Sequence, residues 1–169
     1  PKYIQDERES DNESQKHING IMILYDSKPS LAVEMSCEGR KGFDKYKYAD
    51  YLVEQDKNFF DVFGTYLTYF SNTCNTKTMI FCGSINACES IANYASNVCE
   101  GKLIAVYHSK VKKTQAEKDD LIDRADIIVT TSASLGTGAD ISGIHCIINL
   151  ESYRSDVATV QNPGRLRKE

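Results

Sequence analysis

The sequence predicts an α/β fold built around a mostly parallel sheet, and two observations in the second half of the chain carry this prediction. First, short apolar runs at residues 78–82, 103–107, 126–131 and 145–150 alternate with segments of helical periodicity. Second, these runs are apolar at successive positions, which is typical of parallel strands that helices cover on both faces. We therefore expect right-handed crossovers between consecutive strands.

The helices between these strands have clear start signals. Ser84 precedes a segment, residues 84–99, whose apolar side chains fall on one helical stripe, so it is expected to act as the N-cap. Thr114 and Glu117 have the spacing of a capping box and predict a short charged helix that ends near Arg124. Each helix would complete one β-α-β unit.

The first half of the chain gives weaker signals. Residues 1–19 are almost devoid of apolar side chains and are expected to be a polar linker or tail before a domain that covers residues 20–169. Two apolar runs within residues 18–35 predict strands, or a strand and an extended connection. Residues 37–48 are expected to form a loop, and residues 49–70 one long, partly buried helix. This region would add a strand and a long helix to the sheet.

Composition limits the function classes. The chain has 169 residues and a formal net charge of −4, so no global cationic field attracts it to nucleic acid or membrane, and any basic surface must be local. No apolar run approaches the roughly 18 residues that span a bilayer, and the N-terminal residues lack the pattern of a signal peptide. We expect a protein that is not secreted and has no membrane partner.

The cysteines predict neither a disulfide framework nor a metal site. They form no CxxC pair, and no histidine stands at zinc-ligand spacing beside them. We expect reduced thiols, several of them buried. The six cysteines are Cys37, Cys74, Cys82, Cys88, Cys99 and Cys146.

The residues that follow the predicted strands are rich in glycine and hydroxyl groups. Parallel sheets bind ligands beyond the carboxyl ends of their strands, and hydroxyls and backbone N–H groups there are donors for phosphate oxygens. Ser84 and Thr114 could instead merely cap helices, and the run at residues 130–140 could be a flexible loop. The strand-end residues are Gly83, Ser84, His108, Ser109, Lys110, Thr131, Ser132, Ser134, Glu151 and Ser152.

A cationic turn lies near the same predicted edge. Lys110, Lys112 and Lys113 follow the second strand closely and are candidates for sequence-independent contact with a phosphate backbone, although a solvated face is the alternative. No nucleophile motif lies beside His108, so it is not expected to act as a general base. The sequence contains no GxxxxGK[ST] motif, so the chain should not bind ATP tightly on its own.

Near its end the chain carries Gln161-Asn-Pro-Gly-Arg165-Leu-Arg167-Lys168, after the segments KTMIFCGSI at 77–85 and TTSASLGTGADI at 130–141. This ordered series resembles motifs IV, V and VI of the second RecA-like domain of superfamily 2 helicases, and is most similar to viral or phage DNA helicases and their bacterial relatives. The resemblance covers residues 77–168 and implies a three-layer α/β/α RecA-like fold. It also implies a cytoplasmic, nuclear or virus-infected-cell location.

The resemblance implies that ATP and Mg²⁺ bind between two RecA-like domains, mainly through a first domain that carries the P-loop and the metal-binding acids. Gln161 would face the nucleotide, and Arg165 would be an arginine finger on the γ-phosphate. Arg167 or Lys168 would make a second catalytic contact with ATP. Motif V would add Gly138 and Asp140 to the ATP-binding residues. Because no P-loop precedes these motifs, we expect a fragment of a larger protein that is inactive alone.

The resemblance also assigns nucleic-acid contacts. Motif IV would place Gly83 and Ser84 near a phosphate of DNA or RNA, residues 108–110 would follow, and the motif V hydroxyl would be Thr131 or Ser132. Two other functions stay open: a non-catalytic nucleic-acid-binding module, and a small nucleotide-binding α/β protein. The expected contacts are Gly83, Ser84, His108, Ser109, Lys110, Lys112, Lys113, Thr131 and Ser132.

Overall fold

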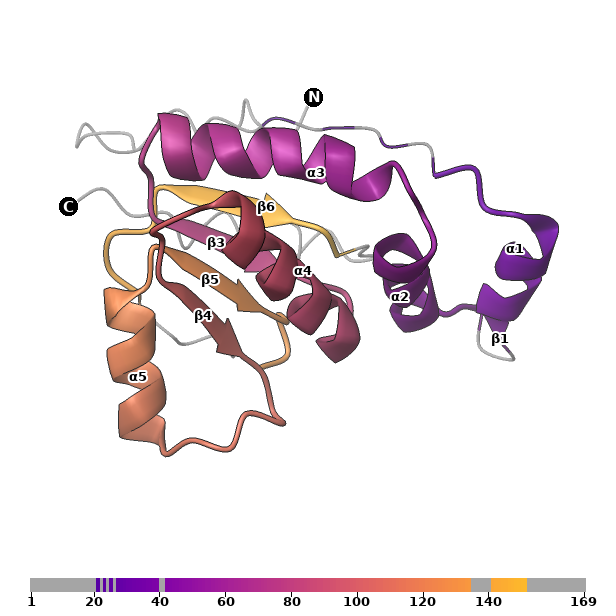
Figure 1. The fold of residues 1–169 in the computed structure, drawn as a ribbon. Helices are drawn as coiled ribbons and strands as arrows, with labels where there is room; N and C mark the ends of the chain where they lie inside the picture. Colours follow the sequence, from indigo (N-terminus) through magenta and orange to yellow (C-terminus); the bar gives the residue numbers. More distant parts are fainter. Residues whose placement is uncertain are drawn as a thin grey trace, which may run out of the picture.

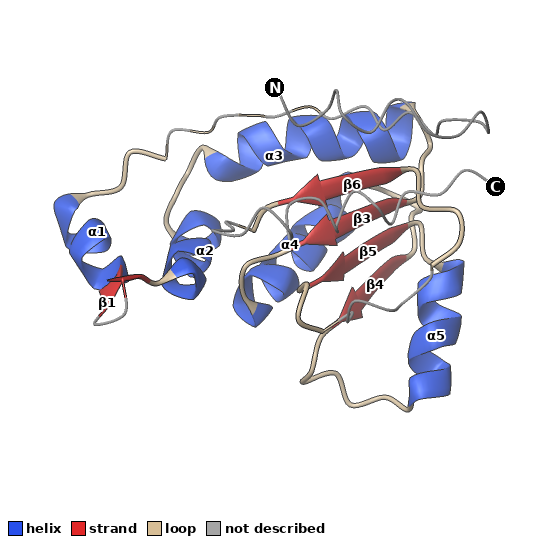
Figure 2. Cartoon of the chain, turned by 180° about the vertical axis from the view of Figure 1, so that it is seen from behind, coloured by secondary structure: helices blue, strands red, loops and turns tan. Residues whose placement is uncertain are grey.

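A parallel sheet of four strands lies at the centre of the fold (Figure 1). The structure is a computed structural model that describes residues 21, 23, 25, 27–39, 42–134 and 141–151. The strands follow the order β4-β5-β3-β6, and Figure 2 shows them pointing the same way. They are β3 (Thr78–Phe81), β4 (Ile104–Tyr107), β5 (Ile127–Thr130) and β6 (Cys146–Asn149). All four confirm the strands expected from sequence.

Helices cover both faces of the sheet, so the predicted three-layer α/β/α arrangement is confirmed. Along β3 and just beyond it the side chains alternate: Ile80 and Cys82 pack among residues of α2, α3 and α4, whereas Met79 and Phe81 pack with Ile122 of α5. These four side chains are fully buried. Both faces of the sheet are therefore apolar because helices cover each of them, as the sequence indicated.

The crossover helices α4 (Ile85–Val98) and α5 (Gln115–Arg124) begin as predicted. The Ser84 hydroxyl accepts a hydrogen bond from the Ala87 N–H at 2.9 Å. In α5 the Thr114 hydroxyl accepts from the Glu117 N–H at 3.3 Å, and the Glu117 carboxylate accepts from the Thr114 N–H at 2.8 Å. Both caps satisfy backbone donors that the first turn of a helix leaves without partners.

The strands expected within residues 18–35 are wrong for the part that the structure describes. Residues 31–37 form helix α1 (Leu31–Cys37), whose N-cap is Ser30. Leu31 and Met35 are 70% and 64% exposed, so this apolar run does not enter the core as a strand would. Residues 21, 23, 25 and 27–30 belong to no strand.

The loop expected at residues 37–48 is also only partly correct. A short antiparallel hairpin of β1 (Glu38–Gly39) and β2 (Gly42–Phe43) occupies its first part. Its second part begins helix α2 (Lys45–Glu54), because the Asp44 carboxylate accepts hydrogen bonds from the N–H groups of Tyr46 and Lys47 at 3.1 and 3.2 Å. An aspartate N-cap therefore starts a helix that the sequence analysis placed later.

The single long helix expected at residues 49–70 is two helices, α2 and α3 (Phe59–Thr68), and a π-helical turn, η1 (Tyr69–Thr73), continues α3. The break lies at Asp56, whose carboxylate accepts from the Asn58 N–H at 3.0 Å and from the Tyr25 hydroxyl at 2.7 Å. A side chain that bonds to nearby backbone competes with helix continuation. Helices α2 and α3 pack on the same face of the parallel sheet as α4. The strand that this region was expected to add to that sheet is not found among the described residues.

The cysteines are free thiols: Cys74 is exposed and the other five are buried. Burial raises the pKa of Cys146 to about 11, so this thiol is protonated at neutral pH. The predicted polar segment at residues 1–19 lies outside the described residues. Within the described ranges, no helix is long and apolar enough to cross a membrane.

The capping box of α5 predicts a pH-dependent contribution to stability. Hydrogen bonds from the Thr114 N–H and hydroxyl lower the pKa of Glu117 below its ordinary value of 4.5. The folded state thus favours the charged carboxylate, and this stabilisation is complete above that ordinary value and disappears as pH falls through the lowered pKa. Urea unfolding from pH 7 to pH 3 should show Glu117→Gln less stable than wild type at pH 7 and equal to it in acid. The matched variant Glu100→Gln removes the same charge at an exposed turn and serves as the control for net charge. A pH-independent difference for Glu117→Gln would contradict the prediction.

Candidate functional site

A pocket of about 620 Å³ lies at the carboxyl ends of the strands. Segments that follow β3, β4, β5 and β6 all contribute to it, as the sequence analysis expected for a ligand edge. Helix α2 forms a further wall. The residues predicted from sequence that line it are Gly83, Ser84, His108, Ser109, Lys110, Thr131, Ser132, Ser134 and Glu151.

Other predicted residues do not line this pocket. Lys112 and Lys113 are exposed on the connection between β4 and α5 and do not contribute to the lining. Their role in nucleic-acid binding stays a prediction. The predicted ATP-binding and catalytic residues Gly138, Asp140, Gln161, Arg165, Arg167 and Lys168 lie outside the described residues, and so does Ser152.

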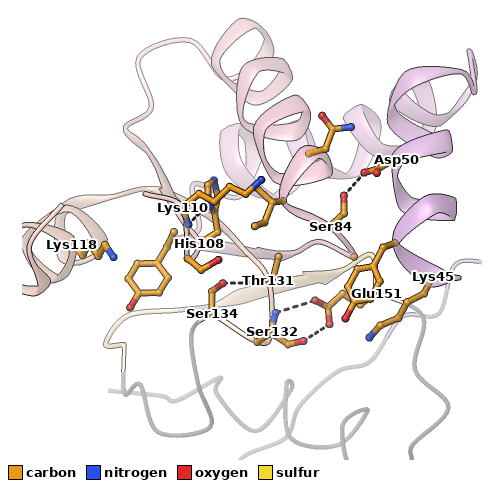
Figure 3. A pocket seen from close by; sticks show the side chains of 17 residues that line it. Lys45, Asp50, Ser84, His108, Lys110, Lys118, Thr131, Ser132, Ser134 and Glu151 are labelled. Carbon is orange, nitrogen blue, oxygen red and sulfur yellow. Dashed lines mark hydrogen bonds between the residues drawn. The ribbon is translucent and has the colours of Figure 1, made fainter. Parts of the chain in front are cut away.

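Ser84 joins the end of β3 to helix α2 as well as capping α4. Its hydroxyl donates a hydrogen bond to the Asp50 carboxylate while accepting the one from Ala87 (Figure 3). Ser84 is 7% exposed, so both bonds lie mostly out of contact with water. The helix-capping role and the place in the pocket, which the sequence left as alternatives, therefore coexist.

A carboxylate also binds the donors that follow β5. Glu151, just after β6, accepts the Ser132 N–H at 2.9 Å through Oε1 and the Ser132 hydroxyl through Oε2. Beside it, the hydroxyls of Thr131 and Ser134 lie 2.8 Å apart and share a hydrogen bond. A backbone N–H and a hydroxyl that converge on one oxyanion group are the donors that a phosphate would use, and here a carboxylate of the chain holds them in place.

His108 lines the pocket although its side chain is buried. It is 3% exposed; its Nε2 lies 2.7 Å from a carboxylate oxygen of Glu89, and its Nδ1 accepts the Lys110 N–H at 3.3 Å. Because Nδ1 accepts, the neutral ring carries its proton on Nε2 and donates it to Glu89. The ring thereby links α4, which carries Glu89, to the turn that carries Lys110.

Helix α2 supplies the residues that the sequence analysis missed. Lys45, Tyr46 and Asp50 all line the pocket. Asp44 before an amphipathic segment was a signal that could have revealed this helix. α2 approaches closely because position 83 is glycine: a Cβ built there would lie 2.8 Å from the Cβ of Ala49.

The pocket has a cationic bias on an acidic chain. Lys45, Lys110 and Lys118 line it against the carboxylates Asp50 and Glu151. Figure 3 shows Lys118 at one end and Lys45 at the other, with the hydroxyls between them. Among the residues that the structure describes, no group of three or more His, Cys, Asp or Glu side chains is placed to hold a metal ion. The lining therefore combines hydroxyl groups with one more lysine than carboxylates, and two of the lysines stand at its two ends.

Comparison with known proteins places most of the chain in a described family. The family model for the helicase conserved C-terminal domain matches residues 60–168, that is, from α3 onward. The earlier elements α1, β1, β2 and α2 precede the match. No curated protein and no solved structure matches the chain significantly.

The close approach of α2 to Gly83 predicts a second-site rescue. Gly83→Ala should lower the free energy of unfolding by about 1–3 kcal/mol, because its Cβ overlaps Ala49. Ala49→Gly alone should cost about 1 kcal/mol through helix propensity, but less in the Gly83→Ala background, where it removes the overlap. Denaturant unfolding of the four chains measures this coupling; additive effects would show that α2 does not pack on Gly83.

Proposed function

Because the chain belongs to the helicase conserved C-terminal domain family, we propose that it is the second motor domain of an ATP-dependent helicase or translocase of superfamily 2. The pocket is proposed to bind the phosphate backbone of DNA or RNA. The observation that carries this proposal is the convergence on one pocket of hydroxyls that follow β3, β4 and β5 with lysines from α2, α5 and the segment after β4. The order of the motifs ending in Gln161 to Arg165 supports the superfamily, and their viral or phage character stays part of the proposal.

The lining favours contact with phosphates rather than with particular bases. Lys45, Lys110 and Lys118 supply charge, and the hydroxyls of Thr131 and Ser134 supply adaptable donors. Such groups bind any sequence and release counterions, so the affinity should be sequence-independent and should fall steeply with salt. A motor that moves along a strand needs this indifference to sequence.

The two carboxylates shape how a phosphate would bind. Asp50 and Glu151 already accept the hydrogen bonds of Ser84 and Ser132. A phosphate that took the Ser132 donors would displace Glu151, whereas a phosphate beside the lysines would leave it in place. Because repulsion from two carboxylates offsets part of the attraction, affinity for nucleic acid should depend strongly on the three lysines.

ATP is proposed as the substrate of the complete motor. The sequence has no phosphate-cradling motif, and the described residues hold no cluster suited to Mg²⁺. We therefore assign the metal and most nucleotide contacts to a first RecA-like domain. Gly138, Asp140 and Gln161 would contact ATP from this domain. Arg165 would stabilise transition-state charge as an arginine finger, and Arg167 or Lys168 would make a second contact.

The phosphate-backbone proposal predicts which lysines set the salt dependence. Lys110→Ala with Lys118→Ala should reduce the slope of log affinity against log salt by about 1 to 1.5 for a single strand, since two phosphate contacts disappear. The control, Lys112→Ala with Lys113→Ala, removes the same charge outside the pocket and should change the slope less. Fluorescence anisotropy with a labelled oligonucleotide measures both. Equal changes would place the contact on the whole turn, and no change in either would remove the nucleic-acid proposal.

The arginine-finger proposal predicts a specific loss of turnover. In the ATP-hydrolysing protein that contains this domain, Arg165→Ala should lower nucleic-acid-stimulated ATPase by roughly 10³-fold while nucleic-acid affinity stays nearly normal. Arg167→Ala and Lys168→Ala, assayed beside it, identify the second contact. The melting temperature of each variant separates chemistry from folding. Near-normal turnover for Arg165→Ala would favour a non-catalytic nucleic-acid-binding module.

A further inference from the structure

One wall of the pocket comes from outside the matched family region. Helix α2 ends at Glu54, before the match begins at residue 60, yet its Lys45, Tyr46 and Asp50 line the pocket. The helix is held there by the Asp50 bond to Ser84 and by its contact with Gly83. The wall therefore comes from residues that precede the match, and two contacts hold its helix beside the end of β3.

Tyr46 differs from the other tyrosines of α2. Tyr48 packs against Phe43 and Tyr51, with ring centroids 5.3 and 6.0 Å apart, and its hydroxyl is 2.5 Å from the hydroxyl of Ser27. Tyr46 is 58% exposed at the pocket, and among the described contacts its ring meets only the Lys45 ammonium, 5.3 Å from the ring centroid. An aromatic ring beside a lysine is thus presented to whatever enters the pocket.

The far end of the pocket repeats this pairing. Lys118 of α5 lies 5.4 Å from the ring centroid of Tyr107, at the end of β4, and both residues line the pocket. Tyrosine faces interleaved with lysines are the combination that binds single-stranded nucleic acid, because bases stack on the rings while lysines neutralise the adjoining phosphates. Figure 3 shows the lysines of the two pairs, Lys45 and Lys118, at opposite ends of a row of hydroxyls.

Accepting that the pocket binds nucleic acid, as proposed above, we propose that it takes an unpaired strand, with one base stacked on Tyr46 and the neighbouring phosphate on Lys45. In a duplex each base face is covered by the next base pair, so a protruding tyrosine stacks only on a base that has left the helix. α2 would therefore give the domain its preference for single strands. The hydroxyls and Lys110 would contact the backbone between the two tyrosines.

The absence of tryptophan from the sequence allows a direct test of stacking. Tyr46→Trp places one tryptophan at the proposed platform, and Tyr69→Trp places one at another exposed tyrosine, 53% exposed on η1. Adding single-stranded oligothymidine to the 169-residue chain should quench the fluorescence of Tyr46→Trp and leave Tyr69→Trp unchanged. An abasic strand of equal length should bind through its phosphates with little quenching.

Affinity provides an independent readout. Tyr46→Ala should weaken binding of the oligothymidine strand about tenfold, the value of one base stack, while Tyr46→Phe keeps the ring and near-normal affinity. Duplex of the same sequence should bind wild type and Tyr46→Ala equally, since it offers no free base. The matched variant Tyr69→Ala should bind both as wild type does. Melting temperatures show whether each variant is folded.

The outcomes separate this inference from the function on which it rests. Oligothymidine could bind in a salt-dependent way without quenching Tyr46→Trp and with unchanged affinity for Tyr46→Ala. This result would overturn the role of α2 and leave the proposed binding of the phosphate backbone by the pocket intact. An equal loss of duplex and single-strand binding in Tyr46→Ala would also overturn it. No binding of any strand by folded wild-type chain at low salt would overturn both proposals.

Discussion

The parallel pairing of β3 with both β5 and β6 is the constraint on which the rest of this structure depends. Ile80 lies opposite Val129 on one side and Ile148 on the other, so the strands start and finish at matching heights. Equal direction brings every strand-end segment to one edge, and it also leaves two apolar faces that helices must cover. The pocket and the α/β/α layers are thus two results of one pairing, because a strand that ran the other way would carry its end segment to the opposite edge of the sheet.

The strands and helices in the second half of the chain could mostly be predicted from sequence, because the signals that specify them are local. A buried strand, the N-cap at Ser84 and the capping box at Thr114 each depend on residues within a few positions, and the structure contains all of them. The candidate edge could be predicted for a similar reason, because parallel strands bring their ends together whatever the side chains are.

The rest depended on contacts between distant residues, which no local pattern contains. The run at Leu31 resembled a strand because a short apolar run does not distinguish strand from helix, and only its exposure shows that it does not enter the core. The α2 wall meets β3 through a contact between residues 34 positions apart, Ala49 and Gly83. Glu151 reaches Ser132 across 19 positions, and Glu89 reaches His108 across another 19. Spacing along the chain does not predict such partners.

The hydrogen bonds between the Glu151 carboxylate and Ser132 bear on how long the proposed nucleic-acid strand would stay bound. An incoming phosphate that takes these donors replaces one anion by another, so the hydrogen bonds gained are largely those already made inside the protein. The same carboxylate would compete with the phosphate for these donors, and this competition would shorten the residence time of a strand bound as proposed. Glu151 accepts the N–H and the hydroxyl of Ser132 together, so both donors already have a partner before a phosphate arrives. A pocket that binds phosphates as proposed would therefore suit repeated, brief occupancy rather than permanent capture.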